Sequence, residues 1–300
     1  MALATDQQNI RRGTTGLVLT PEMSNEIFAK AIEQSAVMQL AERVSLPGSG
    51  LSIPVITGEP TADFVAETAE KPVSYSTFSS KTMTPYKIAV IEPFSMEFRR
   101  DFRRLYDELV RRLPAALSKK FDSTVFFGTA PGTGFDVLTN AAAQNIETNP
   151  YEGLVAAYGR IADAGYTPNA HALSPAGEVI LFGALDGNSR PLFLPSVADN
   201  SVGSILGAKV VRNSNVYNGT SNPKVVGFMG DWTQAKYGIV DGINVAISDQ
   251  ATINTGTEQL NLWQRNMFAV RAEFEVGFIV SDANAFVKLT GATASQGGQG

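Results

Sequence analysis

Apolar residues recur at steps of three and four along one long stretch of the chain, residues 94–127. This spacing places them on one face of an α-helix, so the pattern predicts a long amphipathic helix. Pro114 is expected to kink or interrupt the helix, because proline removes an amide donor and crowds the preceding turn. Gly128 is expected to end it. The apolar stripe consists of Phe98, Phe102, Leu105, Leu109, Leu113, Leu117 and Phe121.

Three shorter helices are predicted from a common start signal, a hydroxyl or amide side chain followed by proline. The side chain caps free amides of the first turn, and the fixed backbone angle of proline suits the first helical position. The signals are Thr20-Pro21, Asn149-Pro150 and Ser174-Pro175, and the expected ends are at residues 46–50, Gly165 and about Phe182.

Alternation of apolar and polar residues predicts the strands. From Val270 to Phe278, apolar side chains alternate with Arg271, Glu273 and Glu275, which indicates one buried and one charged face. A second strand at 285–289 is expected to pack with it on the long helix. Together with the helices, the strands predict an α+β fold. The other predicted strands are Leu51–Ile56, Tyr86–Ile91, His171–Leu173, Lys209–Val211, Val225–Met229, Tyr237–Val240 and Ile243–Ile247.

Residues 57–81, between two predicted strands, form a stretch of 25 residues with little core-forming character. A loop of this length within a compact domain is uncommon and is usually functional or disordered. Ordering it costs about 1–2 kcal/mol per residue in backbone entropy, which its few apolar side chains do not offset. An ordered loop therefore indicates a binding partner, and a flexible surface hairpin is the alternative.

Composition limits the chemistry that the chain can perform. The 300 residues include no cysteine and one histidine, which argues against disulfides, thiolate metal sites and histidine-rich metal sites. The net charge of −5 does not indicate a protein that coats nucleic acid over its whole surface. No secretory signal precedes the first helix, and no run approaches the roughly 18–20 apolar residues that cross a bilayer. We expect no cofactor, no metal and no membrane association.

Charge is unevenly distributed along the chain. Residues 99–120 carry eight basic and three acidic side chains, a net +5, which leaves −10 for the remainder. This basic face either contacts nucleic-acid phosphates without reading sequence or is simply solvated. Its members are Arg99, Arg100, Arg103, Arg104, Arg111, Arg112, Lys119 and Lys120.

Two motifs in loops suggest binding chemistry, and each has a simpler interpretation. The acids Asp63, Glu67 and Glu70 lack the glycine-marked spacing of a calcium loop, so a solvated or partner-facing acidic loop is expected. The stretch Gly128–Gly134 lacks the Gly-Lys-Ser/Thr ending of a phosphate loop and follows a helix rather than a strand. It therefore predicts a tight turn.

Two further motifs are also interpreted as structural. His171 and Ser174 suggest a hydrolase pair, but no Gly-x-Ser-x-Gly elbow is present, so Ser174 is expected to be an N-cap and His171 a structural residue. Asn218-Gly219-Thr220 matches the N-glycosylation pattern, but without a secretion signal it predicts a turn.

Three phrases carry a resemblance to a known family: VIEPFSMEFRRD, FDSTVFFGTAPGTGFDVLTNA and FAVRAEFEVGFIVSDANAFVKLT. With the order of the elements, they make the chain similar to tailed-bacteriophage major capsid proteins of the Hong Kong 97-type fold. The resemblance implies an N-arm, an E-loop hairpin, a long spine helix in a P-domain, and an A-domain with a mixed sheet and flanking helices. The implied segments are 1–19 (N-arm), 20–50 (N-terminal helix and connection, P-domain), 51–91 (E-loop, tip in 57–81), 92–143 (spine helix and rest of the P-domain), 144–261 (A-domain), 262–291 (return strands of the P-domain) and 292–300 (C-terminal tail).

The resemblance also implies contacts between subunits. E-loops of this family lie across neighbouring subunits, which gives the long loop its partner, and N-arms are likewise held by neighbours. Some relatives join an E-loop lysine to a neighbour's asparagine; Lys71 and Lys81 are available here, but no crosslink is expected. The implied contact residues are Asp63, Phe64, Glu67, Glu70 and Lys71 in the E-loop, and Arg11 and Arg12 in the N-arm.

The implied function is structural rather than enzymatic. The chain would self-assemble into hexamers and pentamers of an icosahedral shell around double-stranded DNA, as part of the virion, after assembly in the host cytoplasm. The implied partners are further copies of the chain, a portal protein, decoration proteins, non-specifically packaged DNA, and a separate scaffolding protein or none. Only about 20 residues precede the first predicted helix, so no fused scaffolding domain is expected. The basic helix is expected to face the interior or a scaffold.

Two alternatives stay open from the sequence alone. An encapsulin nanocompartment shares this fold and is distinguished by a cargo enzyme encoded beside it and by the usual lack of so clear an N-arm. A soluble enzyme with a carboxylate-based site would need converging acids in a pocket, and the sequence supplies no such set.

Overall fold

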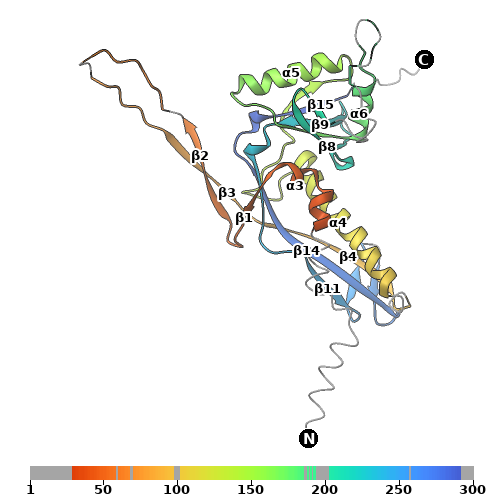
Figure 1. Ribbon diagram of the computed structural model, residues 1–300. Helices are drawn as coiled ribbons and strands as arrows, with labels where there is room; N and C mark the ends of the chain where they lie inside the picture. Colours follow the sequence, from red (N-terminus) through yellow and green to blue (C-terminus); the bar gives the residue numbers. More distant parts are fainter. Residues whose placement is uncertain are drawn as a thin grey trace.

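The computed structural model describes residues 29–58, 60–67, 70–97, 102–185, 188, 190, 192–193, 203–256 and 258–291. For residues 56–57 and 102–111 it describes the backbone alone. Two sheets occupy opposite ends of the body, a long helix runs along the lower one, and a narrow hairpin projects from the side (Figure 1).

The lower sheet has five strands and is built around β14 (Met267–Val280). One edge of β14 pairs antiparallel with β4 (Tyr86–Ser95). The other edge pairs with β11 (Asn244–Ser248) and then with β10 (Ala235–Ile239). At the end of the sheet, β1 (Glu42–Ser45) adds to β10 in parallel.

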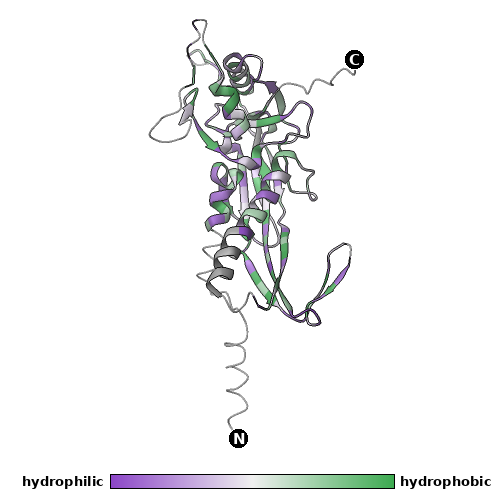
Figure 2. Ribbon diagram, turned by 90° about the vertical axis from the view of Figure 1, so that its right-hand side faces the viewer, coloured by the Kyte–Doolittle hydropathy of each residue, from purple (hydrophilic) through white to green (hydrophobic). Residues whose placement is uncertain are grey.

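The two faces of β14 differ as the alternation predicted, and Figure 2 shows hydrophilic and hydrophobic residues alternating along the strands. Val270 and Phe278 are buried in the core beside α4 (Phe102–Phe127). On the opposite face, Lys87 of β4 lies 3.3 Å from Glu275 in an exposed ion pair. This sheet therefore has one face in the core and one polar face.

The upper sheet has six strands in mixed orientation. Their order is β5 (Ala142–Asn145), β15 (Phe286–Thr290), β9 (Val225–Gly230), β6 (Ala170–Leu173), β8 (Ala208–Arg212) and β7 (Ser204–Ile205). Two helices, α5 (Pro150–Asp163) and α6 (Pro175–Phe182), pack on one face. Both begin as predicted, because the side chains of Asn149 and Ser174 accept hydrogen bonds from amides of the first turns.

One aromatic core joins α4 to both sheets. Phe121 of α4 meets Phe278 of the lower sheet edge to face, with ring centroids 6.3 Å apart. Phe126, one turn further along, lies 4.8 Å from Phe228 of the upper sheet. Because β9 is buried on both faces, Met229 points the other way into a second core under α5 and α6. The C-terminal half of α4 thus holds the two sheets together.

A buried carboxylate adds a polar junction beside this core. Asp122 of α4 is fully buried and accepts hydrogen bonds from Ser35 Oγ at 2.6 Å and from the Ala36 amide at 2.9 Å. Ala36 opens the short helix α3 (Ala36–Leu40). Asn215 Nδ2, from the turn after β8, donates to the same carboxylate at 3.0 Å. Burial raises the pKa of Asp122, and the hydrogen bonds from these donors act in the opposite direction.

The long helix and the N-terminal helix both differ from the prediction. The long helix does not begin at Phe94, because Phe94 lies in β4 and stacks on Phe268 of β14 with ring centroids 5.6 Å apart. The helix is described from Phe102 onwards. Pro114 lies inside the helix without interrupting it. Residues 29–34 are helical and α3 follows after Ser35, but the chain then enters β1 instead of continuing as a helix. The expected start at Thr20-Pro21 lies outside the described residues.

Strand partners also correct the expected arrangement. β2 (Leu51–Gly58) pairs with β3 (Thr77–Met83), a strand that the polar pattern of residues 57–81 did not predict. Because β4 pairs with β14, the hairpin ends at Met83 and not at Ile91. β15 joins the upper sheet instead of packing with β14 on the long helix. β10 and β11 pair with β14 in the lower sheet, although both lie within residues 144–261, the segment expected to form the A-domain.

We predict that Asp122→Ala lowers the free energy of unfolding by about 3 kcal/mol or more, because buried donors at the start of α3 lose their acceptor. Urea denaturation of the purified chain measures the change. Asn254→Ala is the control, since the exposed Asn254 side chain accepts from the Gly256 amide at 2.9 Å in a surface turn, a contact worth about 1 kcal/mol. Equal losses in the two variants would contradict the prediction.

Candidate assembly surfaces

The hairpin formed by β2 and β3 leaves the body and extends well beyond it (Figure 1). Its register runs from the pair Leu51 and Met83 at the base to Gly58 and Thr77. Pro54 lies within β2, where its missing amide is tolerated because a two-stranded ribbon leaves one edge of each strand unpaired. No third strand of the described chain covers the hairpin, so both of its edges are open.

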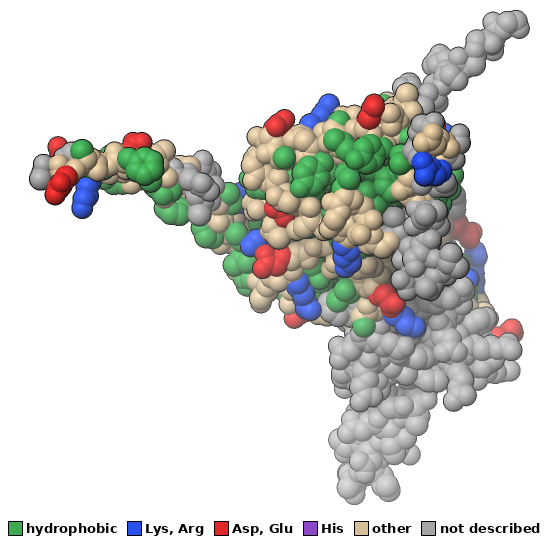
Figure 3. All heavy atoms as spheres, turned by 45° about the horizontal axis from the view of Figure 1, so that its top comes forward, with side chains coloured by type: hydrophobic (Ala, Val, Ile, Leu, Met, Phe, Trp, Pro, Cys, Tyr) green, Lys and Arg blue, Asp and Glu red, His purple; other side chains and the backbone are tan. Residues whose placement is uncertain are grey.

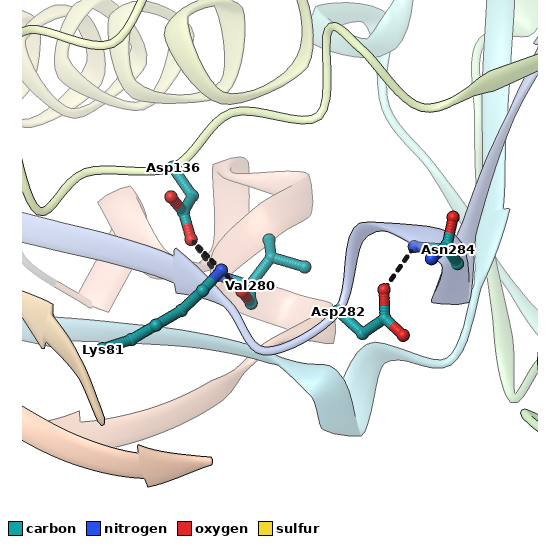
Figure 4. A network of polar contacts seen from close by, with 5 residues as sticks. All are labelled: Lys81, Asp136, Val280, Asp282 and Asn284. Carbon is teal, nitrogen blue, oxygen red and sulfur yellow. Dashed lines mark hydrogen bonds and ion pairs between the residues drawn. The ribbon is translucent and has the colours of Figure 1, made fainter. Parts of the chain in front are cut away.

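The base of the hairpin is fixed to the body by a small polar network (Figure 4). Lys81 Nζ donates to the carbonyl oxygen of Val280 at 2.6 Å and lies 3.2 Å from Asp136 Oδ2. The Val280 amide donates to the same Asp136 oxygen at 3.0 Å. Beside this network Met83 is fully buried against Leu46. The end of β14 therefore anchors β3 through side-chain and backbone contacts together.

The glycine-rich stretch after α4 supports the same base. Gly134 has a φ of +79°, and its amide oxygen accepts from the Thr84 amide at 2.8 Å. A Cβ at Gly134 would lie 2.7 Å from the carbonyl oxygen of Thr82, so only glycine allows this approach. The structure thus confirms a turn at this stretch, and its role is to pack against the root of the hairpin.

The outer part of the hairpin combines apolar and acidic side chains. Phe64 is fully exposed and Tyr75 is 82% exposed. The loop is held in part by Ser74, whose hydroxyl accepts from the Thr61 amide at 2.8 Å. Large apolar groups left in water on an extended element make this tip a candidate docking surface. All five contact residues expected here are exposed: Asp63, Phe64, Glu67, Glu70 and Lys71.

The basic face of the long helix is only partly described. Arg112 is paired with Glu92 of β4 at 3.3 Å, so it does not present a free charge. Lys119 and Lys120 are exposed further along α4. Residues Arg11, Arg12, Arg99 and Arg100 lie outside the described residues, as do the side chains of Arg103, Arg104 and Arg111.

An apolar face on the upper helices was not predicted from the sequence. Figure 3 shows hydrophobic side chains gathered over this end of the molecule. α6 places Val179 and Phe182 on its exposed side, and α5 contributes Tyr151 and Val155. The run Val-Ile-Leu-Phe in α6 could have predicted this face. Four successive apolar residues point to several sides of a short helix, and the sheet beneath covers only one of those sides.

His171 and Ser174 have structural roles, as expected. His171 is buried in β6 and its Nε2 lies 3.0 Å from the carbonyl oxygen of Ile205, whereas its Nδ1 has no partner among the described residues. Burial lowers the pKa of His171. Ser174 caps α6 and donates to the carbonyl oxygen of Val226 at 2.7 Å. Asn218 closes a turn by accepting from the Thr220 amide at 3.1 Å.

Metal-binding groups and membrane-spanning helices are two further kinds of candidate site. It contains no group of three or more acidic or histidine side chains that could hold a metal ion. None of its helices is long and apolar enough to cross a bilayer. The hairpin and the apolar face of α5 and α6 carry exposed large hydrophobic side chains.

Comparison with known proteins shows which family the chain belongs to. The model of the phage capsid family matches residues 15–291. The chain belongs to the phage capsid family. Membership makes it a structural component of the virion rather than an enzyme, which confirms the role of major capsid protein predicted from the sequence.

Named relatives cover nearly the whole chain. It is 33% identical over 299 residues to the probable major capsid protein gp17 of Mycobacterium phage L5, covering 93% of this chain and 90% of that protein. It is 25% identical over 286 residues to the major capsid protein of Staphylococcus phage 80alpha, covering 90% and 84% respectively.

Solved structures share the fold. The match to a chain of Mycobacterium phage Adephagia has a TM-score of 0.70 at 24% identity, covering 86% of this chain and 90% of that one. The match to a chain of Gordonia phage Cozz has a TM-score of 0.69 at 22% identity and covers 87% of both chains. These likenesses agree with the mixed helix and strand content of an α+β capsid fold.

We predict that Lys81→Met loosens the hairpin without unfolding the body, because one buried carbonyl loses a charged donor. Hydrogen exchange of the β3 amides should become about tenfold faster, which corresponds to about 1.4 kcal/mol. Lys87→Met is the control, since Lys87 is itself exposed and its ion pairs with Glu273 and Glu275 lie on the open face of the lower sheet, away from the hairpin. Equal exchange rates in wild type and Lys81→Met would contradict the anchoring role.

We predict that acid destabilises the fold through His171. Since burial lowers its pKa from 6.5, the unfolded chain binds the proton first, and stability is lost as pH falls from 6.5 through the folded-state pKa. The loss is up to about 1.4 kcal/mol per pH unit. Because the chain has one histidine, His171→Gln should remove this slope in urea denaturation between pH 7.5 and 5. If the free energy of unfolding changed with pH in the same way in the wild type and in His171→Gln, the prediction would be wrong.

Proposed function

We propose that the chain builds the icosahedral shell of a tailed phage from hexamers and pentamers of subunits with the Hong Kong 97-type fold, enclosing double-stranded DNA. Family membership supports the capsid role. The observation that carries the finer proposal is the hairpin, which is fixed at its base by Lys81 and Asp136 and exposed at an apolar, acidic tip.

Each part of the fold has a role in this proposal. The hairpin over 51–83 is the E-loop and lies across a neighbour. The lower sheet with α4 is the P-domain and meets other P-domains at three-fold positions. The upper sheet with α5 and α6 is the A-domain, and its apolar face, including Val179 and Phe182, is covered by neighbours around each capsomer axis. The N-arm over 1–19, with Arg11 and Arg12, ties capsomers together.

Further partners belong to the same proposal. The shell is closed by a portal protein and binds decoration proteins, and assembly takes place in the host cytoplasm with a separate scaffolding protein or none. The basic residues at the start of the long helix face the interior, where they contact packaged DNA or the scaffold without sequence specificity. These residues are Arg99, Arg100, Arg103, Arg104 and Arg111.

We expect the purified chain, alone or with the phage's other assembly proteins, to form capsomers, sheets or shells in electron micrographs. The double variant Phe64→Ser, Tyr75→Ser should stay folded but yield at least tenfold fewer particles. Each exposed ring that is buried at an interface is worth about 1.5–3 kcal/mol, and the loss repeats at every contact of the shell.

The control is Ile91→Thr, which changes an exposed apolar residue outside the hairpin. Particle yield from this control should match the wild type. A wild-type chain that stays monomeric under all conditions would overturn the proposed function. A double variant that assembles normally would show that the hairpin side chains Phe64 and Tyr75 are not needed for assembly.

A further inference from the structure

A groove of about 670 Å³ lies where the N-terminal helical segment, α4 and the turn after β8 meet. Asp122 joins these three elements beneath the groove, because it accepts hydrogen bonds from Ser35, Ala36 and Asn215. Residues at steps of four along α4 line one wall: Lys119, Ser123 and Phe127. The groove therefore combines one face of the long helix with two segments that lie far from it in the sequence.

Two aromatic rings line this groove. Tyr217 is 42% exposed, and Phe127 is half-buried at the end of α4. A Cβ at Gly219 would lie 2.9 Å from Cε1 of Tyr217, so the tyrosine ring packs directly on the backbone of Gly219. Because glycine alone allows this approach, the turn after Tyr217 holds the ring in place while part of it stays open to a ligand.

One buried acceptor in the groove has no donor. Oε1 of Gln34 is buried and takes part in no hydrogen bond within the described chain. The backbone carbonyl of the same residue accepts from Asn213 Nδ2 at 2.7 Å, so the position of Gln34 is fixed. A buried acceptor without a partner is unfavourable, and a ligand that supplies an N–H to it would be stabilised.

The groove also has a basic rim. Lys119 is exposed and forms no ion pair with a described residue. Arg212 lies 3.4 Å from Glu178, but its own side chain remains 48% exposed. Glu33 is the one acidic residue among the described residues that line the groove. The rim therefore favours an anionic ligand.

This combination fits the chemistry of a nucleotide. A base offers a flat face that stacks on an aromatic ring and an N–H for a buried acceptor, and the phosphate carries the charge that lysine and arginine bind. A base inside a duplex is covered on both faces by its neighbours and must first be unstacked, which costs free energy. The groove therefore suits an unpaired nucleotide better than a base pair.

We infer that this groove binds an unstacked nucleotide of a single-stranded nucleic acid, with the base against Tyr217 and Phe127. An N–H of the base points to Gln34 Oε1, and the phosphate lies towards Lys119. The contact does not read the sequence, since every base has a face that stacks. It goes beyond the proposed shell, because the site is complete within one chain, and beyond the contact of the start of the long helix with packaged DNA, which uses phosphates alone.

The position of the groove favours nucleic acid over an acidic peptide. Residues 99–120 carry eight basic and three acidic side chains, and Lys119, near the end of that stretch, lines the groove. A strand with a phosphate at every nucleotide can follow such a stretch over its whole length. A peptide would need acidic side chains at the matching spacing to do the same.

Two other hollows lack this combination of groups. The pocket on the open face of the lower sheet is lined by Ile91, and its one basic residue, Arg271, lies 3.5 Å from Glu273. The hollow beside Trp263, whose side chain is 71% exposed, is lined by Asp249 and by no basic residue of the described chain. Trp263 is therefore an exposed ring in a place where a phosphate is not favoured.

Fluorescence anisotropy on the unassembled full-length chain tests the inference, with labelled oligodeoxythymidine of about ten nucleotides and a duplex of the same length as probes. We expect the single strand to bind at least about fivefold more tightly than the duplex. Tyr217→Leu should weaken binding of the single strand at least about fivefold, whereas Tyr217→Phe should stay within about twofold, because a phenyl ring still stacks. Trp263→Leu is the matched control and should leave the affinity unchanged.

Salt dependence identifies the phosphate contact. Lys119→Gln should weaken binding of the single strand and reduce the slope of log K against log salt by about 0.7, the value for one phosphate contact. Lys209→Gln is the matched control, since Lys209 is an exposed lysine on β8 outside the groove. All variants should keep the urea midpoint of the wild type, so that a loss of binding is not a loss of folding.

Photocrosslinking locates the base without any substitution in the chain. A single strand that carries 5-iododeoxyuridine, irradiated on the wild-type protein, should become attached to the peptide that contains Tyr217 or to the one that contains Phe127. Mass spectrometry identifies the peptide. This result keeps the inference testable even where a variant fails to fold.

The outcomes separate the groove from the proposed shell. Equal affinities for single strand and duplex, an unchanged affinity in Tyr217→Leu, or crosslinks only outside the groove would overturn the inference, and particle formation in micrographs would still support the shell. A chain that binds the single strand as expected and forms no particle would keep the groove and overturn the shell.

Discussion

The packing of α4 against both sheets is the contact on which the rest of the structure depends. Phe121 reaches the lower sheet and Phe126 the upper one, so a single helix face sets the position of one sheet relative to the other. Asp122 lies between these two rings in the sequence and fixes the N-terminal segment to the same helix. Close-packed aromatic rings and a fully bonded carboxylate leave this junction few alternative arrangements.

The rigidity of the body gives the hairpin its direction. An extended two-stranded ribbon is at best marginally stable alone. Here its root is held by Lys81 and by the buried Met83, while the tip exposes Phe64 and several acids. The entropy of ordering such a segment is offset most readily by contacts with another molecule. In the proposed shell, repeated copies of the chain would supply that molecule at high local concentration.

Much of the fold followed from local patterns, whereas strand partners did not. Start signals located α5 and α6, because Asn149 and Ser174 cap their first turns, and alternation located β14, since its burial largely repeats with the strand period. β3 was missed because it projects into solvent and carries the polar sequence Thr-Phe-Ser-Ser-Lys-Thr, with no buried face to mark it. β15 was placed in the wrong sheet because it is buried on both faces, and its sequence shows no side that faces the long helix.

The sequence by itself determined the family, through three phrases and the order of the predicted elements. It also determined the α+β class, the acidic character of the long loop and the capping residues Asn149 and Ser174, because these depend on residues that are close together in the chain. The tertiary structure alone decided that Lys81 anchors the hairpin, that Gly134 packs beneath it and that Asp122 joins α4 to the start of α3. Those features join residues far apart in the sequence. Their contacts depend on strand register and helix packing, which no local pattern specifies.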